Sequence, residues 1–155
     1  MIENIPTLLK VFDTAKSTLS AFTGWKSKNK GDAKVIIEEL KQNSRYLWLV
    51  IEEDVDIGKI VKELSTKEYD RLLKKGFNFN NLKNKKIAKY SSLNNTSLSS
   101  WQDKKTEALV SNIYDKIKDL KTKYPMAKKS KKTRWKIRVK NTQQRILLLL
   151  RHASN

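Results

Sequence analysis

The sequence predicts an all-α fold, a single helical-bundle domain of about five or six helices over residues 1–155. Two observations lead to this prediction. Apolar residues recur at spacings of three and four over several long stretches, which is the period of an amphipathic helix. Residues that favour helix ends, such as aspartate, serine and glycine, stand at the borders of these stretches. A chain of 155 residues is also long enough to bury a sizeable core in one domain.

The first part of the chain predicts two long helices. The first covers about 6–23, because Pro6 suits a first helical position and Gly24 suits a helix end. The second begins near Asp32 and continues through the apolar run 46–51. That short run is also typical of a buried strand. Because it extends the apolar stripe of the preceding residues, we expect a helix there.

Two short helices are expected next. Asp56 can cap the first of them. Ser65 and Glu68 have the spacing of a capping box, in which each side chain satisfies a backbone N–H of the other residue. Gly76 would then end this second helix, since glycine readily adopts the left-handed conformation of a helix C-terminus.

A long irregular loop is expected at about 77–99, with at most one helical turn near 85–90. Ser100 and Asp103 again have capping-box spacing, and Pro125 is expected to end the helix that follows. This helix carries the clearest apolar stripe in the protein, formed by Leu109, Ile113, Ile117, Leu120 and Tyr124.

The last segment, about 131–153, has two interpretations. Apolar residues alternate with cations from Trp135 to Val139, which is a strand pattern. The four leucines at 147–150 favour a helix, and an isolated hairpin would have no other strand to join. We therefore expect a helix. Three of the four tryptophans are expected in the core: Trp48, Trp101 and Trp135.

Composition excludes several classes of protein. The chain has no cysteine and one histidine, so a disulfide scaffold, a cysteine-ligated metal site and a multi-histidine site are ruled out. Its longest uncharged apolar runs, 46–51 and 146–150, are far shorter than the ~20 residues of a membrane span. Charges within the first twenty residues argue against a secretory signal. We expect a soluble, cytoplasmic protein without a cofactor.

The positive charge is concentrated in the C-terminal third, residues 120–155. The formal net charge is +18, and lysine outnumbers arginine 28 to 6, a bias typical of a bacterial-like, AT-rich genome. That bias does not explain why 120–155 contains twelve basic residues and no acidic one. Such segregation favours a polyanion partner, above all nucleic acid. The candidate contacts are Lys128, Lys129, Lys131, Lys132, Arg134, Arg138 and Arg145, with Trp25 in a basic loop at about 25–31 as a stacking residue.

The expected C-terminal helix places Arg134, Arg138 and Arg145 on one face, together with Asn141 and His152. Guanidinium groups match phosphate oxygens in bidentate geometry, so this face can bind phosphates. The same arginines can instead pair with an acidic cluster, formed by Glu52, Glu53, Asp54 and Asp56. Carboxylates of this kind can hold Mg²⁺. The cluster is more typical of a solvated helix end, so no metal site is expected.

Arg145 and His152 also form an Arg-x₆-His pair on one helical face. This pair resembles the Arg-x₄₋₆-His motif of HEPN-type ribonucleases, which are helical bundles with the motif on a late helix. The resemblance implies metal-independent RNA cleavage, with His152 in acid–base catalysis and Arg145 stabilising phosphate charge. The chain departs from the family at Ile146, where a polar residue is usual.

The leading hypothesis is a small basic binding module, and not an enzyme, that contacts nucleic acid or another polyanion through its C-terminal third. Binding would be largely independent of sequence, because phosphate contacts dominate it. One alternative is an interaction or regulatory subunit that docks on an acidic protein partner. The other is a HEPN-like ribonuclease or toxin that uses Arg145 and His152.

Overall fold

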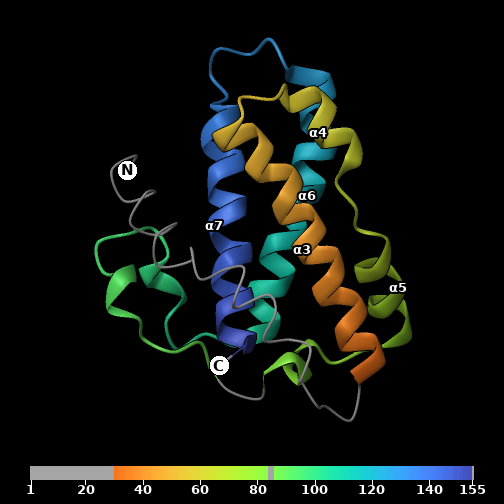
Figure 1. Cartoon of the computed structure of the whole chain (residues 1–155), viewed down its shortest axis with the longest axis vertical. Helices are drawn as coiled ribbons and strands as arrows, with labels where there is room; N and C mark the ends of the chain where they lie inside the picture. Colours follow the sequence, from red (N-terminus) through yellow and green to blue (C-terminus); the bar gives the residue numbers. More distant parts are fainter. Residues whose placement is uncertain (1–29, 84–85, 155) are drawn as a thin grey trace.

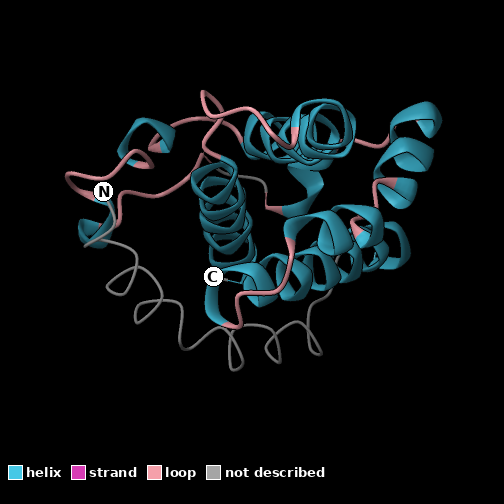
Figure 2. Cartoon of the chain, turned by 90° about the horizontal axis from the view of Figure 1, so that it is seen from above, coloured by secondary structure: helices cyan, strands magenta, loops and turns pink. Residues whose placement is uncertain are grey.

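The computed structural model describes residues 30–83 and 86–154, and within these residues it is an all-α fold without strands. Figure 2 shows helices joined by loops, as the apolar periodicity predicts. The expected helix at 6–23 and the loop that contains Trp25 lie outside the described residues. The α-helices are α3 (Lys30–Glu52), α4 (Ile57–Glu63), α5 (Lys67–Lys75), α6 (Thr106–Ala127) and α7 (Trp135–Ser154).

Three long helices build the described part of the bundle. Helices α3, α6 and α7 run side by side along its long axis, and α7 packs extensively against both others (Figure 1). The short helix α4 packs on α3 and α6, and α5 packs on α3. The run 46–51 lies within α3, so it is helical as expected.

The core follows the predicted apolar stripes. On α6, Leu109, Ile113, Ile117 and Leu120 are all buried, whereas Tyr124 is half-buried. Trp101 and Trp135 are buried as expected, but Trp48 is only half-buried.

Burial changes along α7. Its first turns expose Lys136, Ile137 and Arg138, whereas the residues 146–150 are all buried. The helix begins at Trp135, a few residues later than the expected boundary near 131. One helix therefore presents cations at its beginning and core residues at its end.

Pro125 does not end its helix, which continues to Ala127. Tertiary contacts fix this last turn. The indole Nε1 of Trp135 donates to the carbonyl oxygen of Ala127 at 3.3 Å, and the Tyr124 ring packs edge-on against Trp135 at 5.2 Å between ring centroids. These contacts hold the helical conformation although proline removes one backbone donor.

The predicted capping box of Ser65 and Glu68 does not form. Thr66 is the N-cap residue of α5, and its side chain makes no capping hydrogen bond. Glu39 of α3 takes that role, because its Oε2 accepts from the N–H of Glu68 at 2.8 Å and its Oε1 accepts from the N–H of Tyr69 at 3.2 Å. The C-terminal prediction is confirmed: Gly76 follows α5 with φ of 80°.

Other predicted caps also take different roles. Asp32 lies within the first turn of α3 and pairs with Lys75 at 2.7 Å. Asp56 is the N-cap residue of α4, but its side chain makes no capping hydrogen bond. Helix α6 begins at Thr106, so Ser100 and Asp103 do not cap it.

The segment between α5 and α6 is irregular, as expected, but its helical turns lie elsewhere than near 85–90. They are the 3₁₀ turns η2 (Phe79–Leu82), η3 (Ser91–Leu93) and η4 (Ser99–Trp101). Ile87 is instead held in an extended pairing: its N–H donates to the carbonyl of Lys104, and its carbonyl accepts from the N–H of Asp103, both at 2.9 Å. These backbone bonds replace those that a helical turn would supply.

Candidate polyanion-binding surface

The loop between α6 and α7, residues 128–134, is the most cationic exposed segment that sequence analysis singled out. It lies at the end of the bundle away from α5 (Figure 1). Its predicted contact residues, Lys128, Lys129, Lys131, Lys132 and Arg134, are all exposed. None of them forms an ion pair with another described residue. The loop cations are therefore free to meet an external anion.

The acidic cluster meets α7 through a residue that the sequence did not single out. Asp54 pairs with Lys136 at 3.3 Å between Oδ1 and Nζ, and the Asp54 side chain is 91% exposed. Neither Arg138 nor Arg145 has an ion-pair partner among the described residues. The hypothesis of buried pairing between these arginines and the cluster is therefore not supported.

Arg138 is exposed and stands over the ring of Trp135, with 5.7 Å between its Cζ and the ring centroid. The Tyr124 ring packs edge-on against the same indole. A guanidinium over an aromatic face is held by a cation–π interaction. Arg138 is thus positioned by the core while its charge stays in contact with solvent.

Arg145 is half-buried and lies about two turns further along α7. Its Nη1 donates to the carbonyl oxygen of Asn141 at 3.0 Å, while its buried Nε has no acceptor among the described residues. Burial lowers the pKa of the Arg145 guanidinium. An arginine nevertheless keeps its charge in a protein, so α7 carries a partly desolvated cation here.

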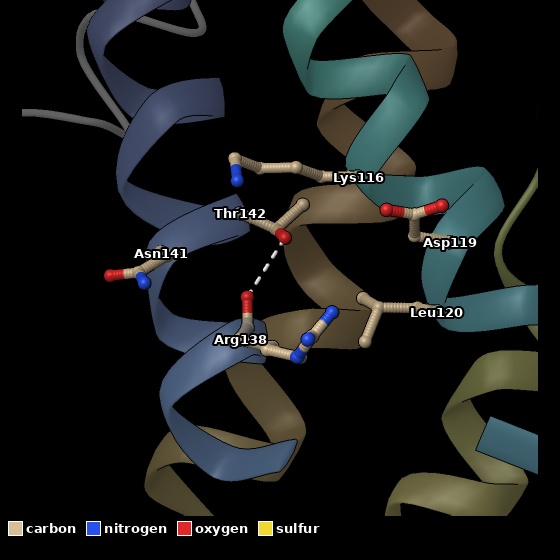
Figure 3. A pocket seen from close by; sticks show the side chains of 6 residues that line it. All are labelled: Lys116, Asp119, Leu120, Arg138, Asn141 and Thr142. Atoms are coloured by element: carbon tan, nitrogen blue, oxygen red, sulfur yellow. Dashed lines mark hydrogen bonds between the residues drawn. The ribbon is translucent and has the colours of Figure 1, made fainter. Parts of the chain in front are cut away.

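A cleft between α6 and α7, the α6–α7 cleft, opens beside Arg138 (Figure 3). Its volume is about 320 Å³, and it is lined by Lys116, Asp119, Leu120, Arg138, Asn141 and Thr142. In Figure 3 Lys116 extends from α6 toward α7, Arg138 extends from α7 toward Leu120, and Asn141 points away from the space between the helices. Thr142 donates its hydroxyl to the carbonyl of Arg138 at 2.9 Å.

Lys116 was missed by sequence reasoning. It lies on α6 between Asp115 and Asp119, outside the acid-free C-terminal third, so local charge gave no signal. In the fold, burial lowers the pKa of Lys116, and the charges of Arg145 and Arg138 lower it further, while Asp119 opposes them. Only the packing of α6 on α7 brings these three cations together.

His152 lies in the core and does not share the exposure of the arginines. It is 2% exposed, and its Nε2 is 2.8 Å from the hydroxyl of Thr106 at the start of α6. That hydroxyl donates to the carbonyl of Lys83 at 3.0 Å. The imidazole and this hydroxyl are thus hydrogen-bonded to each other inside the core. Arg145 is two helical turns away, about 10 Å along the axis.

Residues 30–83 and 86–154 contain neither a grouping of metal ligands nor a membrane-spanning helix. No three histidine or acidic side chains there are grouped so that they could hold a metal ion. No helix in these ranges is both long and apolar enough to span a bilayer.

No protein-family model, curated protein or solved structure matches the chain.

Proposed function

We propose that this protein is a small helical-bundle binding module that contacts the phosphates of nucleic acid through its C-terminal third. One observation carries the proposal. Among the described residues of 128–138, six cations lack a carboxylate partner, and only Lys136 forms an ion pair. Unpaired cations gathered at one end of a molecule create the positive potential that attracts a polyanion.

The N-terminus of α7 adds to this potential. Unsatisfied N–H groups give a helix N-terminus a partial positive charge, which acidic residues usually offset. The first turn of α7 contains no acidic residue, and Arg134 and Lys136 flank its beginning. Lys128 is less informative, because it follows the C-terminus of α6, where a cation is favourable in any case. The proposal therefore depends mainly on Lys131, Lys132 and the arginines.

Aromatic side chains near the loop favour contacts to the backbone of nucleic acid over stacking on bases. The Trp135 ring is buried between Tyr124 and Arg138, so it offers no face to a base. Arg138 and Arg145 lie on one face of α7, about 10 Å apart along its axis, and Arg134 directly precedes the helix. A row of cations that has no stacking platform among the described residues matches phosphates, and we expect binding that depends on salt and little on sequence.

The two alternatives differ in their support. Docking on an acidic protein would use the same cations and is an outcome of the test below. The ribonuclease alternative has less support. His152 is buried and its Nε2 is hydrogen-bonded to Thr106, whereas an acid–base catalyst must reach its substrate.

The test compares two variants of equal charge. In the loop variant, Lys128, Lys129, Lys131 and Lys132 are replaced by Gln. In the control variant, four exposed lysines remote from the loop are replaced by Gln: Lys34, Lys67, Lys74 and Lys86. Affinity for a short DNA duplex and for an RNA of the same sequence is measured by fluorescence anisotropy over a range of salt concentrations.

The loop variant should bind both nucleic acids more weakly at every sequence tried. On duplex DNA, its slope of log K against log salt should flatten by about 0.9 for each phosphate that the protein no longer neutralises. The control variant should keep most of the affinity and slope. If affinity and slope fall equally in the loop variant and the control variant, net charge alone explains the loss, and the proposal is contradicted. Undetectable binding of the unaltered protein at low salt would do the same, and an acidic protein would become the better partner.

A further inference from the structure

We infer that the α6–α7 cleft binds a phosphate group, with Lys116 and Arg138 as its direct ligands and Arg145 beside them as a further positive charge. The inference rests on the proposed function in one respect, since bound nucleic acid would supply this phosphate from its backbone. It adds Lys116 of α6 to a surface that otherwise consists of the loop and α7.

The cations of the cleft lack a counter-charge among the described residues. Lys116 and Arg138 form no ion pair with any described residue. The carboxylate that lines the cleft, Asp119, pairs with Lys123 at 3.4 Å. The cleft therefore holds more positive than negative charge.

Repulsion between partly buried cations favours a bound anion at this place. Lys116 and Arg145 are both half-buried, and like charges in a partly desolvated place repel one another more strongly than in water. Burial and the two arginines lower the pKa of Lys116, which is the signature of that cost. A bound oxyanion between Lys116 and Arg138 would offset the repulsion and supply acceptors for the N–H groups of these two residues.

The shape of the cleft suits a small anionic group. Lys116 and Arg138 reach into the space between α6 and α7 from opposite helices (Figure 3). The cleft volume of about 320 Å³ is at the lower end of the range for small-ligand sites, ~300–1,000 Å³. That volume suits a phosphate with part of its attached group. A guanidinium and an ammonium facing one space are donors only, which matches a ligand that only accepts.

The probe for the test is inorganic phosphate. The full chain, labelled with ¹⁵N, is titrated at constant ionic strength, with chloride replacing phosphate in the control titration, and the amide signals of residues 116–120 and 138–145 are followed. Three variants are compared. Lys116→Gln removes a proposed ligand, Asp119→Asn removes the opposing carboxylate, and Lys118→Gln is the control, because Lys118 lies on the same helix and pairs with Asp70.

Phosphate should shift these signals saturably, and chloride should not. Lys116→Gln should weaken phosphate binding roughly tenfold, as expected when a hydrogen bond between charged groups is removed. Asp119→Asn should tighten it severalfold, a gain that misfolding cannot imitate. Wild-type affinity in Lys116→Gln, or an equal weakening in Lys118→Gln, would overturn the inference.

A competition arm separates this inference from the proposed function. If saturating DNA duplex blocks the phosphate shifts, the backbone of nucleic acid is the source of the bound group. If the cleft binds phosphate but no nucleic acid binds, the phosphate site stands, with a free phosphate compound as its ligand, and the proposed function fails. If duplex binds through the loop lysines while phosphate leaves the cleft signals unmoved, the proposed function stands and the cleft inference is overturned.

Discussion

The Tyr114 hydroxyl donates a hydrogen bond of 2.8 Å to Oε1 of Glu39, which ties the middle of α6 to α3 at a buried carboxylate. Glu39 also accepts from the Ser65 hydroxyl at 2.9 Å and from two backbone N–H groups at the start of α5. One turn later on α3, Asn43 exchanges two hydrogen bonds with the backbone of Ser65. Two side chains of α3 thus fix where α5 begins.

Glu39→Ala should destabilise the protein by about 3 kcal/mol or more, because it leaves several buried donors without an acceptor. Tyr114→Phe should cost less, about 1–2 kcal/mol, since Glu39 keeps its other donors. Urea denaturation measures both changes. Glu38→Ala is the matched control: its carboxylate is 53% exposed and bonds to Lys41, whose side chain is 10% exposed, so we expect a smaller loss, about 1 kcal/mol. Equal effects of Glu38→Ala and Glu39→Ala would contradict the capping role.

The same hydrogen bond predicts a dependence on alkaline pH. Burial, and then the charge of Glu39, raise the pKa of Tyr114 well above the ordinary tyrosine value of about 10. In the unfolded chain this phenol ionises near pH 10, so unfolding releases a proton above that pH. The contribution of Tyr114 to stability is therefore complete below about pH 10 and declines progressively as the pH rises further.

Tyr114→Phe should make the fall of unfolding free energy above about pH 10 shallower, by up to about 1.4 kcal/mol per pH unit. Urea denaturation between about pH 8 and 11 measures this slope. Tyr46→Phe is the control, because it also removes a phenol hydroxyl, at a half-buried tyrosine of α3. If wild-type protein and Tyr114→Phe have parallel pH profiles, the phenol ionises equally in both states and the argument fails.

Within residues 30–83 and 86–154, local sequence rules predicted the helices well and their caps poorly. The apolar stripe of α6 needs only its own spacing to be recognised, and its members Leu109, Ile113, Ile117 and Leu120 are buried as expected. A cap can come from any element, however. The residue that caps α5, Glu39, precedes it by more than 25 positions, while the nearby pair Ser65 and Glu68 had the right spacing and the wrong role. Pro125 shows the same limit, because contacts with Trp135 hold its turn helical.

Some residues of the candidate site could also be predicted from the sequence, and others could not. The loop cations could be identified because they are close together in sequence and no acid interrupts them. A helical wheel placed His152 on the face of Arg134 and Arg138, but a wheel does not describe how burial changes along α7. Lys116 was hidden because its neighbours in sequence are acidic, whereas the arginines of α7 lie near it in space. Its role depends on which face of α6 meets α7, and that is a tertiary property.

Ile113→Ala tests the packing of α6. Ile113 is fully buried within the core. Replacing a buried isoleucine with alanine removes its transfer free energy and leaves a cavity, so we expect unfolding free energy to fall by about 2–5 kcal/mol. Ser111→Ala, at an exposed position of the same helix, should change it by no more than about 0.5 kcal/mol. An unchanged denaturation midpoint for Ile113→Ala would refute the placement of this helix face in the core.

His152→Ala and Thr106→Val distinguish a structural histidine from a catalytic one. Each variant breaks the buried bond between Nε2 and the hydroxyl, and Thr106→Val also leaves the Lys83 carbonyl without that donor. Both should lower the unfolding free energy, by about 1–3 kcal/mol for Thr106→Val. A HEPN-like ribonuclease would behave differently. His152→Ala would abolish RNA cleavage by the folded protein, and Thr106→Val would spare it.

The double variant Arg138→Gln with Arg145→Gln decides between a phosphate-binding face and a structural one. Neither arginine has a carboxylate partner among the described residues, so no buried acid is left unpaired. Breaking a buried ion pair would cost about 3–5 kcal/mol. Here we expect about 0.5 kcal/mol for exposed Arg138 and about 1 kcal/mol for Arg145, whose bond to the Asn141 carbonyl is removed.

Nucleic-acid binding should respond far more than stability does. Two guanidinium groups that contact phosphates contribute to affinity for every sequence, so the double variant should bind duplex DNA more weakly and with a shallower salt slope. Removing both arginines also relieves their repulsion of Lys116, which offsets part of the destabilisation at Arg145. A thermal melt and an anisotropy titration on this one variant give both quantities. A large drop in melting temperature, with unchanged affinity per folded molecule, would show that the arginines hold the bundle together and would refute their assignment to the binding surface.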